Sequence, residues 1–197
     1  MLLGRYILGI TGASGSIYGI RLAQQLLAGG NEVHLVMTAN GRAVVEYETG
    51  YTADELTADL QEHRGRLESY SIDDLFAPIS SGSFKADAMI VAPCSMATLA
   101  HIANGMSGNL LERAADVCIK ERRPLILVPR ETPLSSIHLS NMLALSQAGA
   151  IVLPAMPAFY HKPQSLDDAV NFVVGKTLDA LGIDNDLYKH WNGEINL

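Results

Sequence analysis

A glycine-rich turn near the start of the chain constrains the fold more than any other stretch. Gly9-Ile10-Thr11-Gly12-Ala13-Ser14-Gly15 follows the apolar run 6–8 and precedes an apolar-periodic segment at 17–27. This order predicts a strand, a tight turn and a helix. Glycines let backbone N–H groups approach a ligand, and a helix N-terminus carries partial positive charge, so the turn favours a phosphate group. The alternative is that the glycines serve only the close packing of helix on strand.

The spacing of the glycines argues against a dinucleotide. It is G-x-x-G-x-x-G, whereas dinucleotide-binding units typically carry G-x-G-x-x-G. The next expected strand, 32–37, ends at Thr38-Ala39-Asn40, where such a unit would place an Asp or Glu for the ribose hydroxyls. NAD is therefore disfavoured, and a mononucleotide fits better.

Length and charge predict one domain that does not bind polyanions. With 197 residues, 48% of them hydrophobic, the chain is long enough for one core buried on both sides of a sheet. We expect a single domain over 1–197, with a core at about 5–182 and a tail at 183–197. A net charge of −7 argues against nucleic acid and anionic membrane surfaces, which need basic stripes. No stretch approaches the ~20 apolar residues of a membrane span.

Cysteines, histidines and aspartates show no metal-binding pattern. Cys94 and Cys118 belong to no C-x-x-C motif, which predicts neither a disulfide framework nor a zinc site and favours a reducing cytoplasm. Cys94 is expected to be a small buried hydrophobe rather than a nucleophile. His34, His101 and His138 do not cluster, so we expect structural roles for them. The aspartate doublets do not extend to D-D-x-x-D, which favours a metal-free site.

Apolar runs alternate with helical patterns along the whole chain. Strands are expected at 6–8, 32–37, 69–72, 88–92, 124–128 and 150–153, and helices at 17–27, 41–48, 54–64, 110–118, 136–147 and 166–181. A second strand-to-helix turn is expected at Pro93-Cys94-Ser95. This alternation predicts a three-layer α/β/α sandwich with a mostly parallel sheet and ligands at the carboxyl ends of the strands.

Hydroxyl and cationic side chains follow these strands. Ser14, Thr38, Ser95, Thr98 and Arg130 all fall at expected strand ends, which open on one edge of a parallel sheet. Together with the backbone donors of two helix starts they predict a cradle for a monoester phosphate and a polar ring edge. Each Ser and Thr is also a good helix N-cap, and because a cap leaves the neighbouring N–H groups available, the two interpretations are compatible.

Several longer motifs resemble the UbiX/Pad1 family of flavin prenyltransferases, and the resemblance runs from about residue 6 to 191. The motifs are Thr11-Gly12-Ala13-Ser14-Gly15, Ser81-Gly82-Ser83, Pro93-Cys94-Ser95, residues 109–117, residues 120–124, residues 128–133 and Pro157-Ala158-Phe159-Tyr160. The resemblance implies a flavodoxin/Rossmann-like fold that binds FMN. It implies transfer of the dimethylallyl group of dimethylallyl phosphate to N5 and C6 of reduced FMN, without a metal. The product, prenylated FMN, would serve a UbiD-type decarboxylase, and the chain would form a homododecamer with sites at subunit junctions.

The same resemblance implies roles for individual residues. FMN would contact Gly12, Ala13, Ser14, Thr38, Ser95, Met96, Ala97, Thr98 and Arg130. The prenyl phosphate would contact Tyr160 and Lys176, with Lys120 and Arg130 completing the cationic clamp from neighbouring chains. Apart from the resemblance, Arg113 and Trp191 are further candidates for the substrate side. The catalytic residues would be Glu48 as acid/base, Ser14 beside the reacting flavin, Tyr160 and Glu131.

Four of these positions carry a further expectation or an open alternative. An apolar prenyl pocket is expected to raise the pKa of Glu48 towards neutrality. Arg113 and Lys120 share one helical face, and either clamp the phosphate or pair with Asp116 in solvent. Trp191 either caps the pocket of another subunit or fastens the tail.

Two positions depart from the family pattern. Lys176 stands where relatives carry arginine, which removes a bidentate fork from the phosphate site. Leu75 stands where some relatives carry an aromatic ring, which removes a possible shield for a cationic intermediate.

Two other functions remain open from the sequence. A flavin-dependent cysteine decarboxylase has a related fold, but the stretch 93–98 reads P-C-S-M-A-T where that class carries P-A-S-A-N-T. A non-catalytic FMN carrier would keep the phosphate cradle without needing Glu48, Lys120, Tyr160 and Lys176 together.

Overall fold

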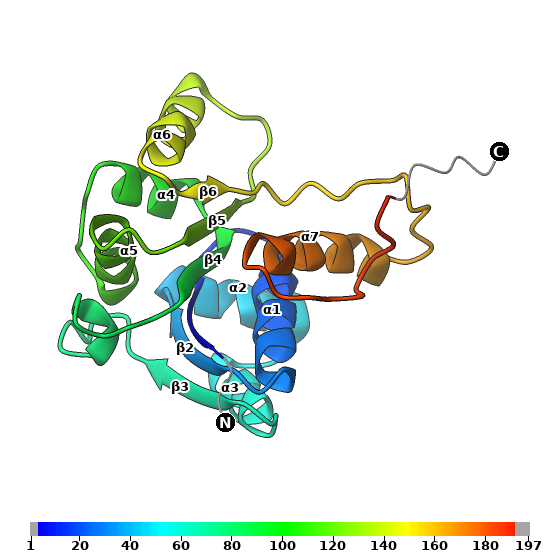
Figure 1. Cartoon of the computed structure of the whole chain (residues 1–197), viewed down its shortest axis with the longest axis horizontal. Coiled ribbons are helices and arrows are strands. Elements are labelled where there is room, and N and C mark those ends of the chain that lie inside the picture. Colours follow the sequence, from blue (N-terminus) through cyan, green and yellow to red (C-terminus); the bar gives the residue numbers. More distant parts are fainter. Residues whose placement is uncertain (1–3, 192–197) are drawn as a thin grey trace. The chain divides into compact units, whose positions relative to one another are not determined.

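A six-stranded parallel sheet organises the computed structural model, which describes residues 4–191 (Figure 1). The strands are β1 (Arg5–Ile10), β2 (Glu32–Met37), β3 (Arg66–Tyr70), β4 (Ala88–Cys94), β5 (Leu125–Pro129) and β6 (Ile151–Val152). They lie in the order β3-β2-β1-β4-β5-β6, and each neighbouring pair is parallel. The chain therefore leaves β1 in one direction and returns to its other side at β4. The carboxyl ends of β1 and β4 form the switch point at which open α/β sheets bind ligands.

Helices from residues 4–154 cover both faces of this sheet. They are α1 (Ser16–Ala28), α2 (Ala39–Thr49), α3 (Ala53–Gln61), α4 (Met96–Ala103), α5 (Leu110–Lys120) and α6 (Ser136–Gln147), with a short 3₁₀ turn, η1 (Pro78–Ser80). A further helix, α7 (Leu166–Ala180), belongs to a separate unit. Two glycines show how closely they pack. A Cβ at Gly19 would lie 2.2 Å from the Ala92 carbonyl oxygen, so α1 lies directly on β4. A Cβ at Gly9 would lie 2.8 Å from Leu111 Cδ1, so α5 lies on the opposite face.

The structure divides after Pro154 into two compact units, which comprise 4–154 and 155–191 among the described residues, and each is described by itself. The first contains the sheet and α1 to α6. The second contains α7 and a cluster of aromatic rings. The expectation of one domain over the whole chain stays a prediction.

Most strands and helices lie where the sequence predicts them, and the α/β architecture with a parallel sheet is confirmed. The third strand differs, because it covers Arg66–Tyr70 rather than 69–72. Its polar sequence gives no apolar run, and its position follows from pairing with β2, where Glu32 opposes Arg66. The third helix ends at Gln61 rather than at residue 64. No helix among residues 4–191 is long and apolar enough to cross a membrane.

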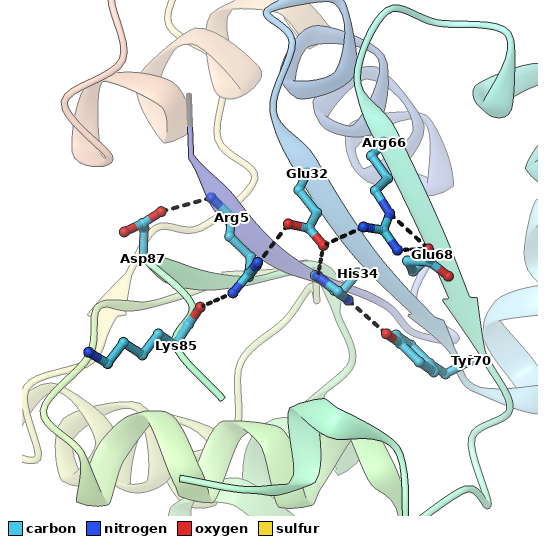
Figure 2. A network of polar contacts seen from close by, with 8 residues as sticks. All are labelled: Arg5, Glu32, His34, Arg66, Glu68, Tyr70, Lys85 and Asp87. Carbon is cyan, nitrogen blue, oxygen red and sulfur yellow. Dashed lines mark hydrogen bonds and ion pairs between the residues drawn. The ribbon is translucent and has the colours of Figure 1, made fainter. Parts of the chain in front are cut away.

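A polar network around the buried Glu32 and His34 joins the first three strands (Figure 2). The Glu32 carboxylate accepts from Arg5 Nε at 2.9 Å and lies 3.1 Å from His34 Nε2. Burial would raise the pKa of Glu32, but the hydrogen bond and charge of Arg5 outweigh it and lower that pKa. With Glu32 ionised, His34 carries its proton on Nε2 and accepts from the Tyr70 hydroxyl, 2.9 Å from Nδ1. His34 is thus a structural histidine, as expected.

Candidate functional site

The Glu48 carboxylate, on α2, caps the N-terminus of α1. Its Oε2 accepts from the Ser16 N–H at 2.8 Å and from the Ser16 hydroxyl at 2.7 Å, and the Gly15 N–H lies 3.0 and 3.1 Å from its two oxygens. Gly15, the N-cap residue of α1, has φ of 100° and offers no side chain to the helix. Glu48 therefore supplies from another helix the anionic cap that α1 lacks.

These hydrogen bonds correct one expectation about Glu48. Burial acts to raise the pKa of its carboxyl, but hydrogen bonds from the Ser14 and Ser16 hydroxyls and from the Gly15 and Ser16 N–H groups outweigh it. The pKa is lowered, not raised towards neutrality. The carboxylate is thus ionised at neutral pH, and its chemistry begins from the proton-accepting form.

Thr11 joins the two strand-to-helix turns. Its buried hydroxyl donates to the Pro93 carbonyl at 2.8 Å and accepts from the Ser95 N–H at 2.7 Å. Ser95 in turn caps α4, accepting from the Thr98 N–H at 3.2 Å and donating to the Thr98 hydroxyl at 3.0 Å. The two turns expected to share one edge of the sheet are therefore held together by one side chain.

Thr38 begins α2 beside the first turn. Its hydroxyl accepts from the Gly41 N–H at 3.0 Å, so the N-cap role expected for it is confirmed. Gly12 lies against this helix, because a Cβ there would lie 2.5 Å from Asn40 Cβ. A side chain at position 12 would push α2 away from the turn.

Arg130 follows β5 and binds the first turn. Its Nε donates to the Ser14 carbonyl at 3.0 Å, which leaves the two terminal nitrogens to face an anion. Met96 and Ala97 open α4, and the N–H groups of a first helical turn have no acceptor within the helix. Hydroxyls, backbone donors and a guanidinium therefore meet at one edge of the sheet. This set of donors fits the phosphate and ring edge of a flavin mononucleotide.

Ala13 and Glu131 complete the predicted residues on this edge. Ala13 is buried in the turn, next to the exposed Ser14. Glu131 is exposed, and its carboxylate accepts from the Thr132 N–H at 3.0 Å. A catalytic role for Glu131 stays a prediction.

Arg113 and Lys120 lie on α5 beside the loop 80–84. Arg113 donates from Nε to the Ser80 carbonyl at 3.1 Å and from Nη1 to Asp116 at 2.8 Å. Lys120 pairs with Glu121, and a Cβ at Gly82 would lie 2.8 Å from Lys120 Nζ. The pairing with Asp116 is thus present for Arg113, while Lys120 uses its neighbour. Both cations stand against the glycine-containing loop.

Tyr160, Lys176 and Trp191 belong to the second unit. The Tyr160 ring lies 5.8 Å from that of Trp191 and 6.0 Å from that of Phe172, both edge to face. Lys176 Nζ lies 3.5 Å from Asp179 Oδ2. Trp191 thus packs on a predicted substrate residue of its own chain. The meeting of these three residues with Arg130 stays a prediction.

Cys94, His101 and His138 lie in surroundings that suit structural roles. Cys94 is fully buried, and burial raises the pKa of its thiol to about 12, as suits a small hydrophobe. His101 Nδ1 lies 2.6 Å from Glu112, and His138 takes part in the capping box of α6. No group of three or more His, Cys, Asp or Glu side chains within residues 4–191 could hold a metal ion.

The sequence interpretation missed Thr11 and Ser16. Both side chains are fully buried although they are polar, and both are hydrogen-bonded to groups more than thirty residues away along the chain. A hydroxyl inside a glycine-rich turn was the available signal. It did not reveal which partner the hydroxyl would meet.

Comparison with known proteins first gives the class. A model of the flavoprotein family matches residues 4–178. A flavin prenyltransferase UbiX from Halalkalibacterium halodurans is 51% identical over 195 residues, which cover 97% of this chain and 95% of that protein. The chain belongs to the UbiX family of flavin prenyltransferases.

Solved structures agree with this assignment. AnUbiX (PadA1), in complex with FMN and dimethylallyl pyrophosphate, has a TM-score of 0.91 at 45% identity and covers 98% of this chain and 99% of its own. A dodecameric FMN-dependent UbiX-like decarboxylase from Escherichia coli O157:H7 has a TM-score of 0.89 at 47% identity, covering 96% and 100%. The cysteine decarboxylase TvaF has a TM-score of 0.60 at 21% identity, covering 76% and 89%, and shares the fold alone.

Proposed function

We propose that this chain transfers the dimethylallyl group of dimethylallyl phosphate to N5 and C6 of reduced FMN. The observation that carries the proposal is the anchoring of an ionised Glu48 at the α1 N-terminus, beside Ser14 and the Arg130 guanidinium. One turn thus brings together a proton acceptor, a hydroxyl and a cation. Membership of the flavin prenyltransferase family supports the same reaction.

The flavin side of the site is assigned to the edge formed by β1, β4 and β5. We assign FMN binding to Gly12, Ala13, Ser14, Thr38, Ser95, Met96, Ala97, Thr98 and Arg130. Hydroxyls and N–H groups at the starts of α2 and α4 would hold the phosphate and the polar ring edge, and Arg130 would add charge. Reduced FMN would supply N5 and C6 as the two positions that become alkylated.

The prenyl side needs cations that stabilise a leaving phosphate. The allylic C–O bond breaks and inorganic phosphate leaves, so fixed positive charge lowers the barrier. We assign this task to Arg113, Lys120, Arg130, Tyr160 and Lys176, with Trp191 closing the pocket. Alkylation of N5 would release the N5 proton to Glu48. Closure of the fourth ring would then need a proton at the prenyl double bond, which Glu48 would return, and the loss of a proton from C6, which Glu48 would accept.

We further propose that the site works in a homo-oligomer. Helix α6 (Ser136–Gln147) has no charged residue, and Ile137, Leu139 and Leu143 are 70%, 53% and 60% exposed. A monomer rarely leaves a helix of this kind in water, and on a chain of net charge −7 a neutral face is where copies approach without repulsion. The dodecameric relative supports a dodecamer. We propose that its sites lie at the junctions of subunits.

A UbiD-type decarboxylase is the proposed recipient of the prenylated FMN. We place the reaction in the cytoplasm, because the buried free thiols of Cys94 and Cys118 suit a reducing compartment.

Anaerobic incubation with reduced FMN and dimethylallyl phosphate, in the presence of a chelator, tests the proposal. We expect mass spectrometry of the recovered flavin to show one added five-carbon unit. Recovery of unmodified FMN alone from folded protein would overturn the proposal. A stable flavin semiquinone without covalent change would indicate an FMN carrier instead, and turnover of a cysteine-containing peptide would indicate a decarboxylase.

A further inference from the structure

We propose that Ser16 is a positioning residue that holds the Glu48 carboxylate on the first turn of α1 and keeps it as the proton acceptor of the site. This inference rests on the proposed function. Ser16 touches neither the flavin edge nor the prenyl cations assigned above, and acts only through Glu48.

The geometry fixes one carboxylate oxygen with two donors of the same residue. The Ser16 hydroxyl lies 2.7 Å and the Ser16 N–H 2.8 Å from Glu48 Oε2. Ser16 is fully buried, whereas Glu48 reaches it from α2 across 32 residues of sequence. A buried hydroxyl that left this oxygen would lose its partner away from water, which costs free energy. The pair is therefore a stable contact rather than a passing one.

Ser14 and Ser16, in the turn before α1 and at its first position, have different roles. The Ser14 hydroxyl also hydrogen-bonds Glu48. Because Ser14 is exposed, this hydroxyl can leave the carboxylate and turn towards a ligand. Ser16 is buried, so its hydroxyl stays with the carboxylate. When Ser14 turns away, Ser16 and the N–H groups of Gly15 and Ser16 still hold the anion.

Charged neighbours contribute little to the ionisation of Glu48. Arg130 binds the Ser14 carbonyl, and Arg42 on α2 is paired with Asp54 of α3 at 2.6 Å. Glu46 lies on the same helix and is exposed. After burial, which acts in the opposite direction, the leading influences on the pKa of Glu48 are hydrogen bonds from residues 14–16. Loss of the Ser16 hydroxyl should therefore raise the pKa of Glu48.

The test is Ser16→Ala, measured first without any reaction. We expect the Glu48 carboxyl, followed by ¹³C NMR in protein free of substrates, to titrate roughly one half to one pH unit higher than in the unchanged protein, the size of one charge-assisted hydrogen bond discounted for partial exposure. An unchanged titration in a folded Ser16→Ala protein would overturn the inference, whatever the enzyme does. This titration does not depend on the proposed function.

The second measurement is the pH profile of prenyl transfer. The acidic limb should move up by the same amount in Ser16→Ala, because less Glu48 is ionised at a given pH. The matched control is Thr52→Ala, which removes a similar hydroxyl from Glu55 at 2.8 Å on α3. It should leave both the Glu48 titration and the limb in place. If the Glu48 titration shifts in Ser16→Ala but the acidic limb of the pH profile does not, Glu48 is not the base that limits prenyl transfer.

Discussion

The Thr11 hydroxyl lies 2.7 Å from the Ser95 N–H, and this contact helps to join the turn after β1 to the turn after β4. The same hydroxyl donates to the Pro93 carbonyl, so both of its hydrogen-bonding functions are used inside the protein. The two halves of the proposed flavin site therefore share one buried side chain.

Thr11→Val tests this contact, because valine keeps the shape and removes the hydroxyl. The Ser95 N–H loses its acceptor, whereas the Pro93 carbonyl keeps the backbone N–H of residue 11 as a donor at 3.3 Å, so we expect a loss of about 1–3 kcal/mol in the free energy of unfolding and weaker FMN binding. Urea denaturation and fluorescence titration with FMN measure both. Thr57→Val removes a hydroxyl that donates to the Ala53 carbonyl at 2.7 Å on α3 and should leave FMN affinity unchanged. Equal FMN affinity in both variants would contradict the bridging role.

Glu48→Gln tests the proton acceptor. We expect FMN to bind normally and ring closure to slow by about 100-fold or more, a typical loss for an acid/base group. Glu46→Gln is the matched control, since its side chain is exposed on the same helix, and it should be nearly neutral. Stopped-flow absorbance with mass spectrometry follows the two bond-forming steps separately. Normal ring closure in Glu48→Gln would leave this carboxylate only the role of a helix cap.

The stability of the chain should fall as the pH drops below about 6.5, the ordinary value for the pKa of His34. Burial lowers the pKa of His34 in the folded protein, although Glu32 acts in the opposite direction. The folded state therefore holds fewer protons than the unfolded state in this range. The stability that neutral His34 contributes is fully present above pH 6.5, and it is lost as the pH falls through the lowered pKa of His34 in the folded protein. The slope from one such group is at most about 1.4 kcal/mol per pH unit.

His34→Gln isolates this contribution, because glutamine does not titrate. Urea denaturation at pH 7.5, 6.5 and 5.5 should show a shallower decline for the variant. The Glu32 contribution appears separately below pH 4.5, where its lowered pKa makes protonation cost stability. Identical slopes between pH 7.5 and 5.5 would show that His34 is not the responsible group.

Leu143→Glu tests the oligomer surface on α6. A carboxylate on this uncharged and exposed face repels the same face of another copy, so we expect smaller species in light scattering and a loss of prenyl transfer with FMN binding reduced less. Gln61→Glu adds the same charge on α3 and should leave the assembly intact. A full-size, active Leu143→Glu oligomer would exclude α6 from the interface.

The pattern of apolar residues was sufficient to locate the buried strands but not the edge strand β3. A parallel strand covered on both faces must be apolar, so β4, buried along its whole length, could be recognised by composition alone. The edge strand β3 is polar, and its limits depend on pairing with β2. Edge pairing is a relation between distant segments that local patterns do not encode.

In the functional site, too, local features could be predicted from the sequence, whereas contacts between distant segments could not. Thr38 and Ser95 could be predicted because a cap follows its strand directly. The predicted direction of the Glu48 pKa was wrong because the sequence indicates an apolar pocket but not the hydrogen-bond donors that meet the carboxylate. Ser16 and Thr11 were missed because their partners lie 32 and 84 residues away.

The strand order also has a consequence for how the chain acquires its binding edge during folding. The pairing of β1 with β4 encloses β2, β3 and three helices between the two partners, so the edge depends on contacts of large sequence separation. Closing such a loop is slow compared with forming local helices. We expect FMN capture during refolding, read by quenching of flavin fluorescence, to lag behind the recovery of helical circular dichroism.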